Sequence, residues 1–86
     1  MSKALRSLYD AGHFQQLSEV AAALADDVGW LWLEILAARY SSEEMHRQYV
    51  NALFMGSDEE VDGARVGYSK AHDRLQSLLQ RAAVID

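Results

Sequence analysis

The stretch Val28-GWLWLEILAAR-Tyr40 is the most apolar part of this 86-residue chain and decides its fold class. It holds both tryptophans, Trp30 and Trp32, and only two charged residues, Glu34 and Arg39. Its apolar residues recur every three or four positions on one side, which predicts a helix with a buried face. Other apolar residues fall on the opposite side, so this helix needs cover nearly all round.

The helical spacing extends in both directions from this stretch. A 4-3-4-3-4-3 pattern precedes and crosses it, and a 3-4-3-4-3-4-3 pattern occupies the end of the chain. These heptad patterns are typical of helices packed side by side, and their positions are Leu17, Ala21, Leu24, Val28, Leu31, Ile35 and Ala38, then Val61, Ala64, Tyr68, Ala71, Leu75, Leu78, Ala82 and Ile85. We predict an all-α fold, a small bundle of three to four helices built on two long antiparallel heptad-patterned helices, with helices at 2–11, 14–40, 42–55 and 58–84.

Local signals set these boundaries. Two Ser-x-x-Glu sequences, at 41–44 and 57–60, match the capping box that starts a helix. Gly12 and Gly56 are placed as helix stops, because glycine adopts the left-handed conformation that ends many helices. The segment 26–29 (Asp-Asp-Val-Gly) weakens the long helix at its middle, so a break into two helices there stays open.

Composition bounds the class of protein. Residues 1–86 suffice for one domain, and the absence of cysteine excludes disulfides and thiolate metal sites. The net charge of −5 disfavours nucleic acid and anionic membranes as partners. We see no signal peptide and no apolar run long enough for a membrane span, so we expect a cytoplasmic protein.

The apolar helix needs a cover, and two are possible. The helices at 2–11 and 42–55 could close over it, or another protein chain could do so, as a homo-oligomer or a hetero-complex. Large aromatic side chains and methionine are enriched in interface cores. We therefore expect a non-catalytic interaction module, namely an adaptor, a chaperone-like subunit or an inhibitor of a larger assembly, whose partner-binding residues are Trp30, Leu33, Tyr40, Phe54 and Met55, with Trp32 as core or contact.

An acidic inhibitor of the phage type, masking a basic surface of a nucleic-acid-handling complex, fits the composition equally well. Negative side chains would steer its association with the basic target. The candidates for this steering are Asp26, Asp27, Asp58, Glu59 and Glu60.

The segment Ala4-LRSLYDAGHFQQLSEVAAA-Leu24 resembles a helical hairpin of the tetratricopeptide (TPR) family. The resemblance covers about a quarter of the chain and implies a scaffold that binds peptides or helices, as in small secretion chaperones. The matching positions are Leu8, Gly12, Phe14, Leu17, Ala21 and Leu24. The segment departs from the family pattern in that Leu5 stands where the family packs a small residue, Leu17 replaces the usual alanine, and no proline closes the unit.

Chemistry-bearing motifs are few. Glu43-x-x-His46 has the spacing of ligands in ferritin-like di-iron proteins, and a dimer could double it, with Glu19 or Glu34 as a further carboxylate. We prefer the alternative that Glu43 sits at a solvated helix start, and we expect no metal and no cofactor. Nucleophile and phosphate-loop motifs are missing from the sequence, so we do not expect an enzyme.

Overall fold

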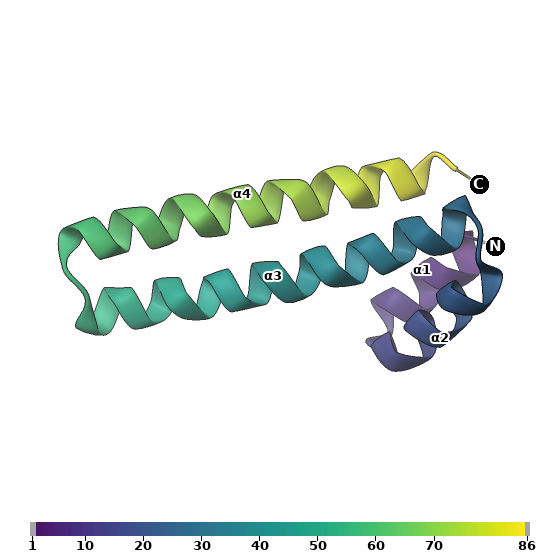
Figure 1. Cartoon of the computed structure of the whole chain (residues 1–86), viewed down its shortest axis with the longest axis horizontal. Helices are drawn as coiled ribbons and strands as arrows, with labels where there is room; N and C mark the ends of the chain where they lie inside the picture. The colour runs from purple at the N-terminus through teal and green to yellow at the C-terminus, as the bar shows by residue number, and fades with distance from the viewer. Residues whose placement is uncertain (1, 86) are drawn as a thin grey trace.

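The computed structural model describes residues 2–85, which form four helices and no strand. The helices are α1 (Ser2–Asp10), α2 (Phe14–Leu24), α3 (Asp27–Met55) and α4 (Asp58–Ala83). The predicted all-α bundle built on two long antiparallel helices is thereby confirmed. In Figure 1, α3 and α4 run antiparallel along the whole length, and the α1–α2 pair lies beneath one end of α3.

One of the two predicted long helices, 58–84, is confirmed as α4, but the other is not where we predicted it. The expected helix 14–40 is wrong, because the chain ends α2 at Leu24, turns at Ala25 (φ 49°) and restarts at Asp27. The side chain of Asp26 caps the new helix by accepting a hydrogen bond from the Gly29 amide at 2.9 Å. The break at 26–29 that the sequence left open is the correct alternative.

The expected helix boundary at residues 40–42 is also wrong, since α3 continues without interruption through Ser41 and Ser42. The segment 42–55 is therefore the second half of α3 and does not fold back over the apolar stretch. In contrast, Ser57 caps α4 as predicted, with its hydroxyl accepting from the Glu60 amide at 3.4 Å. Gly12 ends the α1 region with φ +80°, whereas Gly56 ends α3 in an extended conformation.

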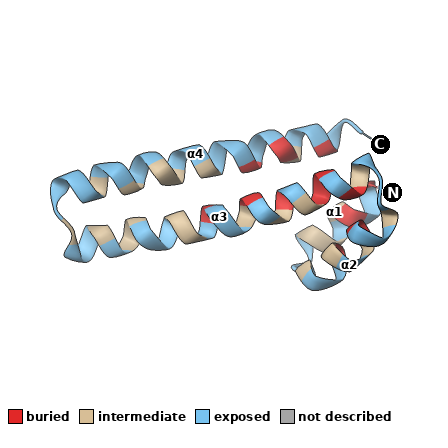
Figure 2. Ribbon diagram, viewed as in Figure 1, coloured by how far each residue is buried: buried red, intermediate tan, exposed pale blue. Residues whose placement is uncertain are grey.

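The core lies at one end of the hairpin. Figure 2 shows the buried positions in the half of the hairpin nearer to α1 and α2, extending to the middle of α3. The first heptad pattern contributes to this core from both α2 and α3. The second reaches it only at Leu75, Leu78 and Ala82, because its earlier positions lie half-buried in the other half of the hairpin and Ile85 is exposed. The buried hydrophobic residues are Leu5, Leu17, Ala21, Leu31, Trp32, Ile35, Ala38, Leu75, Leu78 and Ala82.

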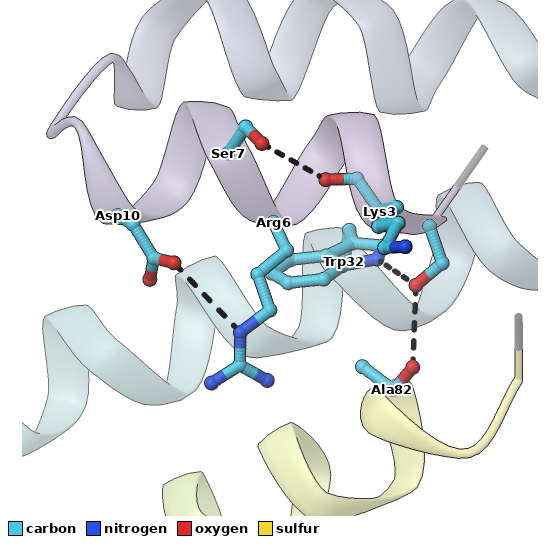
Figure 3. Close-up of polar contacts among 7 residues, drawn as sticks. Lys3, Arg6, Ser7, Asp10, Trp32 and Ala82 are labelled. Atoms are coloured by element: carbon cyan, nitrogen blue, oxygen red, sulfur yellow. Dashed lines mark hydrogen bonds and ion pairs between the residues drawn. The ribbon is translucent and has the colours of Figure 1, made fainter.

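Trp32 is the centre of this core and is fully buried. Its indole N–H donates to the hydroxyl of Ser2 at 3.2 Å, and that hydroxyl donates to the carbonyl of Ala82 at 3.3 Å. Figure 3 shows Trp32 beneath α1, with Ala82 of α4 on the far side of this relay. The ring of Tyr9 packs on the indole with the centroids 5.8 Å apart. One side chain thus ties α1, α3 and α4 together.

The other end of the hairpin consists of two helices alone. There the rings of Tyr49 and Tyr68 stack with centroids 6.4 Å apart, and His46 and His72 flank Tyr68 at 5.3 and 6.0 Å. Gly67 of α4 lies against Met45. Between Ser42 on α3 and Leu75 on α4, the residues are half-buried or exposed. We call this half of the hairpin, residues 45–72, the distal half.

Candidate protein-binding surface

Three consecutive exposed apolar side chains, two of them the most exposed of the large apolar residues, lie at the turn between α3 and α4. Leu53, Phe54 and Met55 are 55, 84 and 89% exposed at the last turn of α3. We call these three residues the tip patch. Phe54 and Met55 are two of the partner-binding residues predicted from the sequence. Burying one such side chain is worth about 1.5–3 kcal/mol, so covering the tip patch would give a substantial gain in free energy.

The other predicted contact residues are distributed along α3. Tyr40 is 70% exposed and Trp30 is 62% exposed, while Leu33 is half-buried against the core. Trp32, which the sequence allowed to be core or contact, is core. Trp30 lines a hollow of about 250 Å³ with Arg81 and Ile85 at the opposite end of the hairpin from the tip patch. Hence the structure does not bring the six residues into one surface.

A continuous stripe on α3 connects Tyr40 with Phe54. Its members are spaced 4-3-4-3-4 and therefore share one face of the helix; they are Leu36, Tyr40, Glu43, Arg47, Val50 and Phe54. We call this set the α3 stripe. Met45, which contacts α4 at Gly67, is two residues from both Glu43 and Arg47 and so points about 200° away from them. The α3 stripe therefore faces away from α4.

Helix α2 covers the continuation of this same face at the core end. Gly29 lies one heptad before Leu36, and a Cβ built on it would stand 2.3 Å from the carbonyl oxygen of Ala21. The cover ends near Arg39, whose guanidinium lies 4.3 Å from the centroid of the Phe14 ring at the start of α2. Beyond this level the face has no helix over it in Figure 1.

Two adjoining hollows lie where the cover ends. The first has a volume of about 410 Å³ and is lined by Phe14, Gln15, Ser18, Leu36, Arg39, Tyr40 and Glu43. The second, of about 300 Å³, is lined by Tyr40, Glu43, Glu44 and Arg47. Since Tyr40 and Glu43 line both, the hollows form one surface along the α3 stripe. Its floor is apolar at the α2 end and charged at the middle.

Ion pairs within α3 border the charged middle of the stripe. Arg39 pairs with Glu43 at 2.9 Å, and Arg47 pairs with Glu44. Glu43 and Arg47 are both more than 60% exposed at the side chain, so water screens these pairs and each adds little to stability. Their charges remain accessible to a second molecule.

The predicted steering residues divide between the two ends of the hairpin. Asp26 and Asp27 begin α3 at the core end, and Asp58, Glu59 and Glu60 fill the first turn of α4 beside the tip patch. All five are exposed. Segment 48–64 holds four acidic residues and neither lysine nor arginine. The tip is therefore an apolar patch with a negative border.

The Glu43-x-x-His46 pair is occupied by other contacts. Glu43 forms an ion pair with Arg39, and the ring of His46 packs on Tyr68. Within residues 2–85, no three histidine, aspartate or glutamate side chains gather in a way that could hold a metal ion. In the same described part of the chain, no helix is both long enough and apolar enough to traverse a lipid bilayer.

The α3 stripe itself was missed at the sequence level, although two of its members, Tyr40 and Phe54, were predicted as contacts. Its spacing is present in the sequence, but the predicted helix boundary at residues 40–42 interrupts it after Tyr40. The ring contacts of Arg39 with Tyr9 and Phe14 join residues from three helices, and no local pattern indicates them.

Comparisons of this chain with protein-family models, with curated proteins and with solved structures return no match.

Proposed function

We propose that this chain is a non-catalytic protein-binding subunit. Another polypeptide would cover the distal face of α3, by which we mean the tip patch and the part of the α3 stripe that α2 leaves uncovered. The observation that carries the proposal is the tip patch, in which Phe54 and Met55 are 84 and 89% exposed. Aromatic and methionine side chains are favoured in interface cores, because they bury a large area at little cost in conformational entropy.

The uneven packing of the hairpin supports this proposal. The core end of α3 lies between α4 and the α1–α2 pair, whereas the part of α3 in the distal half packs on α4 alone. Two exposed aromatic residues of α3, Tyr40 and Phe54, lie on the face that α2 covers at the core end. A protein that supplies the missing layer would bury these residues, as the chain's own helices bury the core end of α3.

The test is photo-crosslinking in cells that express the chain naturally. Benzoylphenylalanine replaces Phe54 in one variant and Gln76, an exposed polar position on α4, in a matched control. We expect position 54 to give a defined protein adduct that position 76 does not give, and mass spectrometry identifies the captured chain. Equal yields at the two positions, or no adduct at position 54, would contradict the proposal.

A basic target surface is a second candidate, favoured by the negative border of the tip patch. Charges at the edge of an interface mainly set the rate of association and its salt dependence. Once the captured protein is known, Asp58→Asn combined with Glu59→Gln should slow association and flatten its dependence on salt. Phe54→Ser should instead accelerate dissociation. If the first variant leaves the association rate unchanged, electrostatic steering by these acids is excluded.

A further inference from the structure

The α3 stripe is complementary to a second copy of itself that runs in the opposite direction. In order they are apolar, apolar, negative, positive, apolar, apolar, from Leu36 to Phe54. When two such stripes lie antiparallel, Leu36 meets Phe54, Tyr40 meets Val50 and Glu43 meets Arg47, and each contact occurs twice. A two-fold interface requires this reciprocity, in which one residue contacts a second and the second contacts the first.

We propose that two copies of this chain pair through the α3 stripe, with their α3 helices antiparallel. The inference rests on the proposed function and names the polypeptide that covers the distal face. Each α3 would contact its counterpart over residues 36–54, about 27 Å at 1.5 Å per residue. The outer layers would be the two α4 helices, so the distal halves together form a row of four helices with the two α3 helices in the middle.

The ends of the stripe have complementary shapes. In the antiparallel register, Phe54 of the second copy arrives at the 410 Å³ hollow beside Phe14, Leu36 and Arg39. There the Arg39 guanidinium already lies over an aromatic ring, and a second ring gives the same kind of contact. The exposed phenylalanine and the apolar hollow are thus two halves of one contact.

Charge favours this arrangement at the tip as well. Helix α2 starts with no acidic residue in its first turn, and its N-cap residue His13 makes no capping hydrogen bond through its side chain. The antiparallel register brings the acidic first turn of the second copy's α4 toward this positive helix end. Negative groups are stabilising at a helix N-terminus. A parallel pairing would instead set the two acidic tips against each other.

The exposed area of one chain matches what such a dimer needs. The accessible surface is 5833 Å². A compact monomer of this mass exposes about 5,100 Å², so the chain carries an excess of about 700 Å², and each partner in a standard interface buries about 800 Å². The radius of gyration of 15.1 Å likewise exceeds the value of about 12 Å for a compact chain of this length.

Charge exchange at the centre of the stripe tests the inference. Sedimentation velocity of the full chain, over micromolar to millimolar concentrations, should show a dimer. Glu43→Arg places arginine against Arg47 at both symmetric contacts, and Arg47→Glu places glutamate against Glu43. Each single variant should dissociate at least about tenfold more readily, which is a change of about 1.4 kcal/mol.

Two further samples distinguish an effect on the interface from an effect on folding. The double variant with both exchanges restores opposite charges and should dimerise like the unmodified chain. An equimolar mixture of the two single variants should form a mixed dimer, because each arginine then meets a glutamate. Loss of the intrachain pairs with Arg39 and Glu44 cannot explain this rescue, since the double variant loses both. Equal helicity by circular dichroism is the control for folding.

An unmodified chain that stays monomeric at every concentration overturns the inference, as do single variants that dimerise normally or a mixture that fails to recombine. The proposed function is judged separately. If the chain is monomeric but benzoylphenylalanine at position 54 captures a different protein, the proposed function stands and a foreign chain is the cover. If it is monomeric and captures nothing, both are wrong.

Discussion

Gly29 is the position where one added methyl group tests the packing of α2 on α3 most directly. It is buried, and the backbone of α2 approaches it closely: a Cβ at this position would lie 2.3 Å from the Ala21 carbonyl oxygen and 3.2 Å from the Leu24 Cβ. Real Cβ atoms do not approach other atoms within 3.0 Å, so Gly29→Ala must displace the α2 backbone by at least 0.7 Å. The same change at Gly63, in the second turn of α4, meets nothing within 4 Å.

Because of these distances, we expect the same glycine-to-alanine substitution to change the folding stability in opposite directions at the two positions. Alanine is favoured over glycine inside a helix by about 0.8–1.0 kcal/mol. At Gly63 nothing opposes this gain, so Gly63→Ala should stabilise the protein by about 0.5–1 kcal/mol. At Gly29, overpacking costs about 1–3 kcal/mol. The upper part of this range, about 2–3 kcal/mol, applies because the clash is with backbone, which cannot rotate away as a side chain can. We therefore expect Gly29→Ala to destabilise by about 1–2 kcal/mol net, despite its better helix propensity.

Thermal unfolding followed by circular dichroism measures both variants. For a domain of this size, 1 kcal/mol shifts Tm by about 4–8 °C. Gly29→Ala should lower Tm by about 4–16 °C, and Gly63→Ala should raise it by about 2–8 °C. All samples are compared at one protein concentration, because self-association adds to apparent stability. A Gly29→Ala protein as stable as the unmodified chain would refute the close approach of α2 to α3.

Three further outcomes follow from caps, burial and the distal half. Ser57→Ala should lose a helix cap and about 0.5–2 kcal/mol in urea unfolding, whereas Ser41→Ala, inside α3, should change stability by less than about 0.5 kcal/mol; equal losses would contradict the continuous helix. Acrylamide should quench the fluorescence of Trp30 strongly and that of Trp32 weakly when each is the sole indole left by Trp-to-Phe substitution, and equal quenching would place both in the same environment. Amide hydrogens in residues 45–72 should exchange faster than those at the core end at low protein concentration. Slower exchange in residues 45–72 would show that two helices alone are enough to make the distal half stable.

The sequence predicted the fold class and the inward face of each helix more reliably than it predicted where the helices end. The heptad spacing from Leu17 to Ala38 runs unbroken across Ala25, so periodicity gives no sign that the chain reverses there. Leu17 and Ala21 do point into the core, but from an antiparallel helix. Tertiary packing decides this point, because α2 turns back to bury its apolar side on α3.

The two Ser-x-x-Glu sequences show why local capping signals are ambiguous. Ser57 follows Gly56 and begins α4, whereas Ser41 lies exposed inside a helix that continues on both sides. A hydroxyl caps a helix only where the backbone already departs from helical geometry. At Ser41 nothing forces that departure, and α4 packs against α3 on either side of it. The stripe from Leu36 to Phe54 follows from the sequence only once the helix is known to be continuous.

The unequal lengths of α2 and α3 leave much of the face of α3 opposite α4 without a covering helix from this chain. At 1.5 Å per residue, the 29 residues of α3 extend about 43 Å and the 11 residues of α2 about 16 Å. One short hairpin can therefore shield little more than a third of the face opposite α4. Closing the remainder within the chain would need roughly two more helices of the same size. The apolar residues Val50 and Phe54 lie where the chain has no helix of its own to cover them. This is the position that the proposed second polypeptide would occupy.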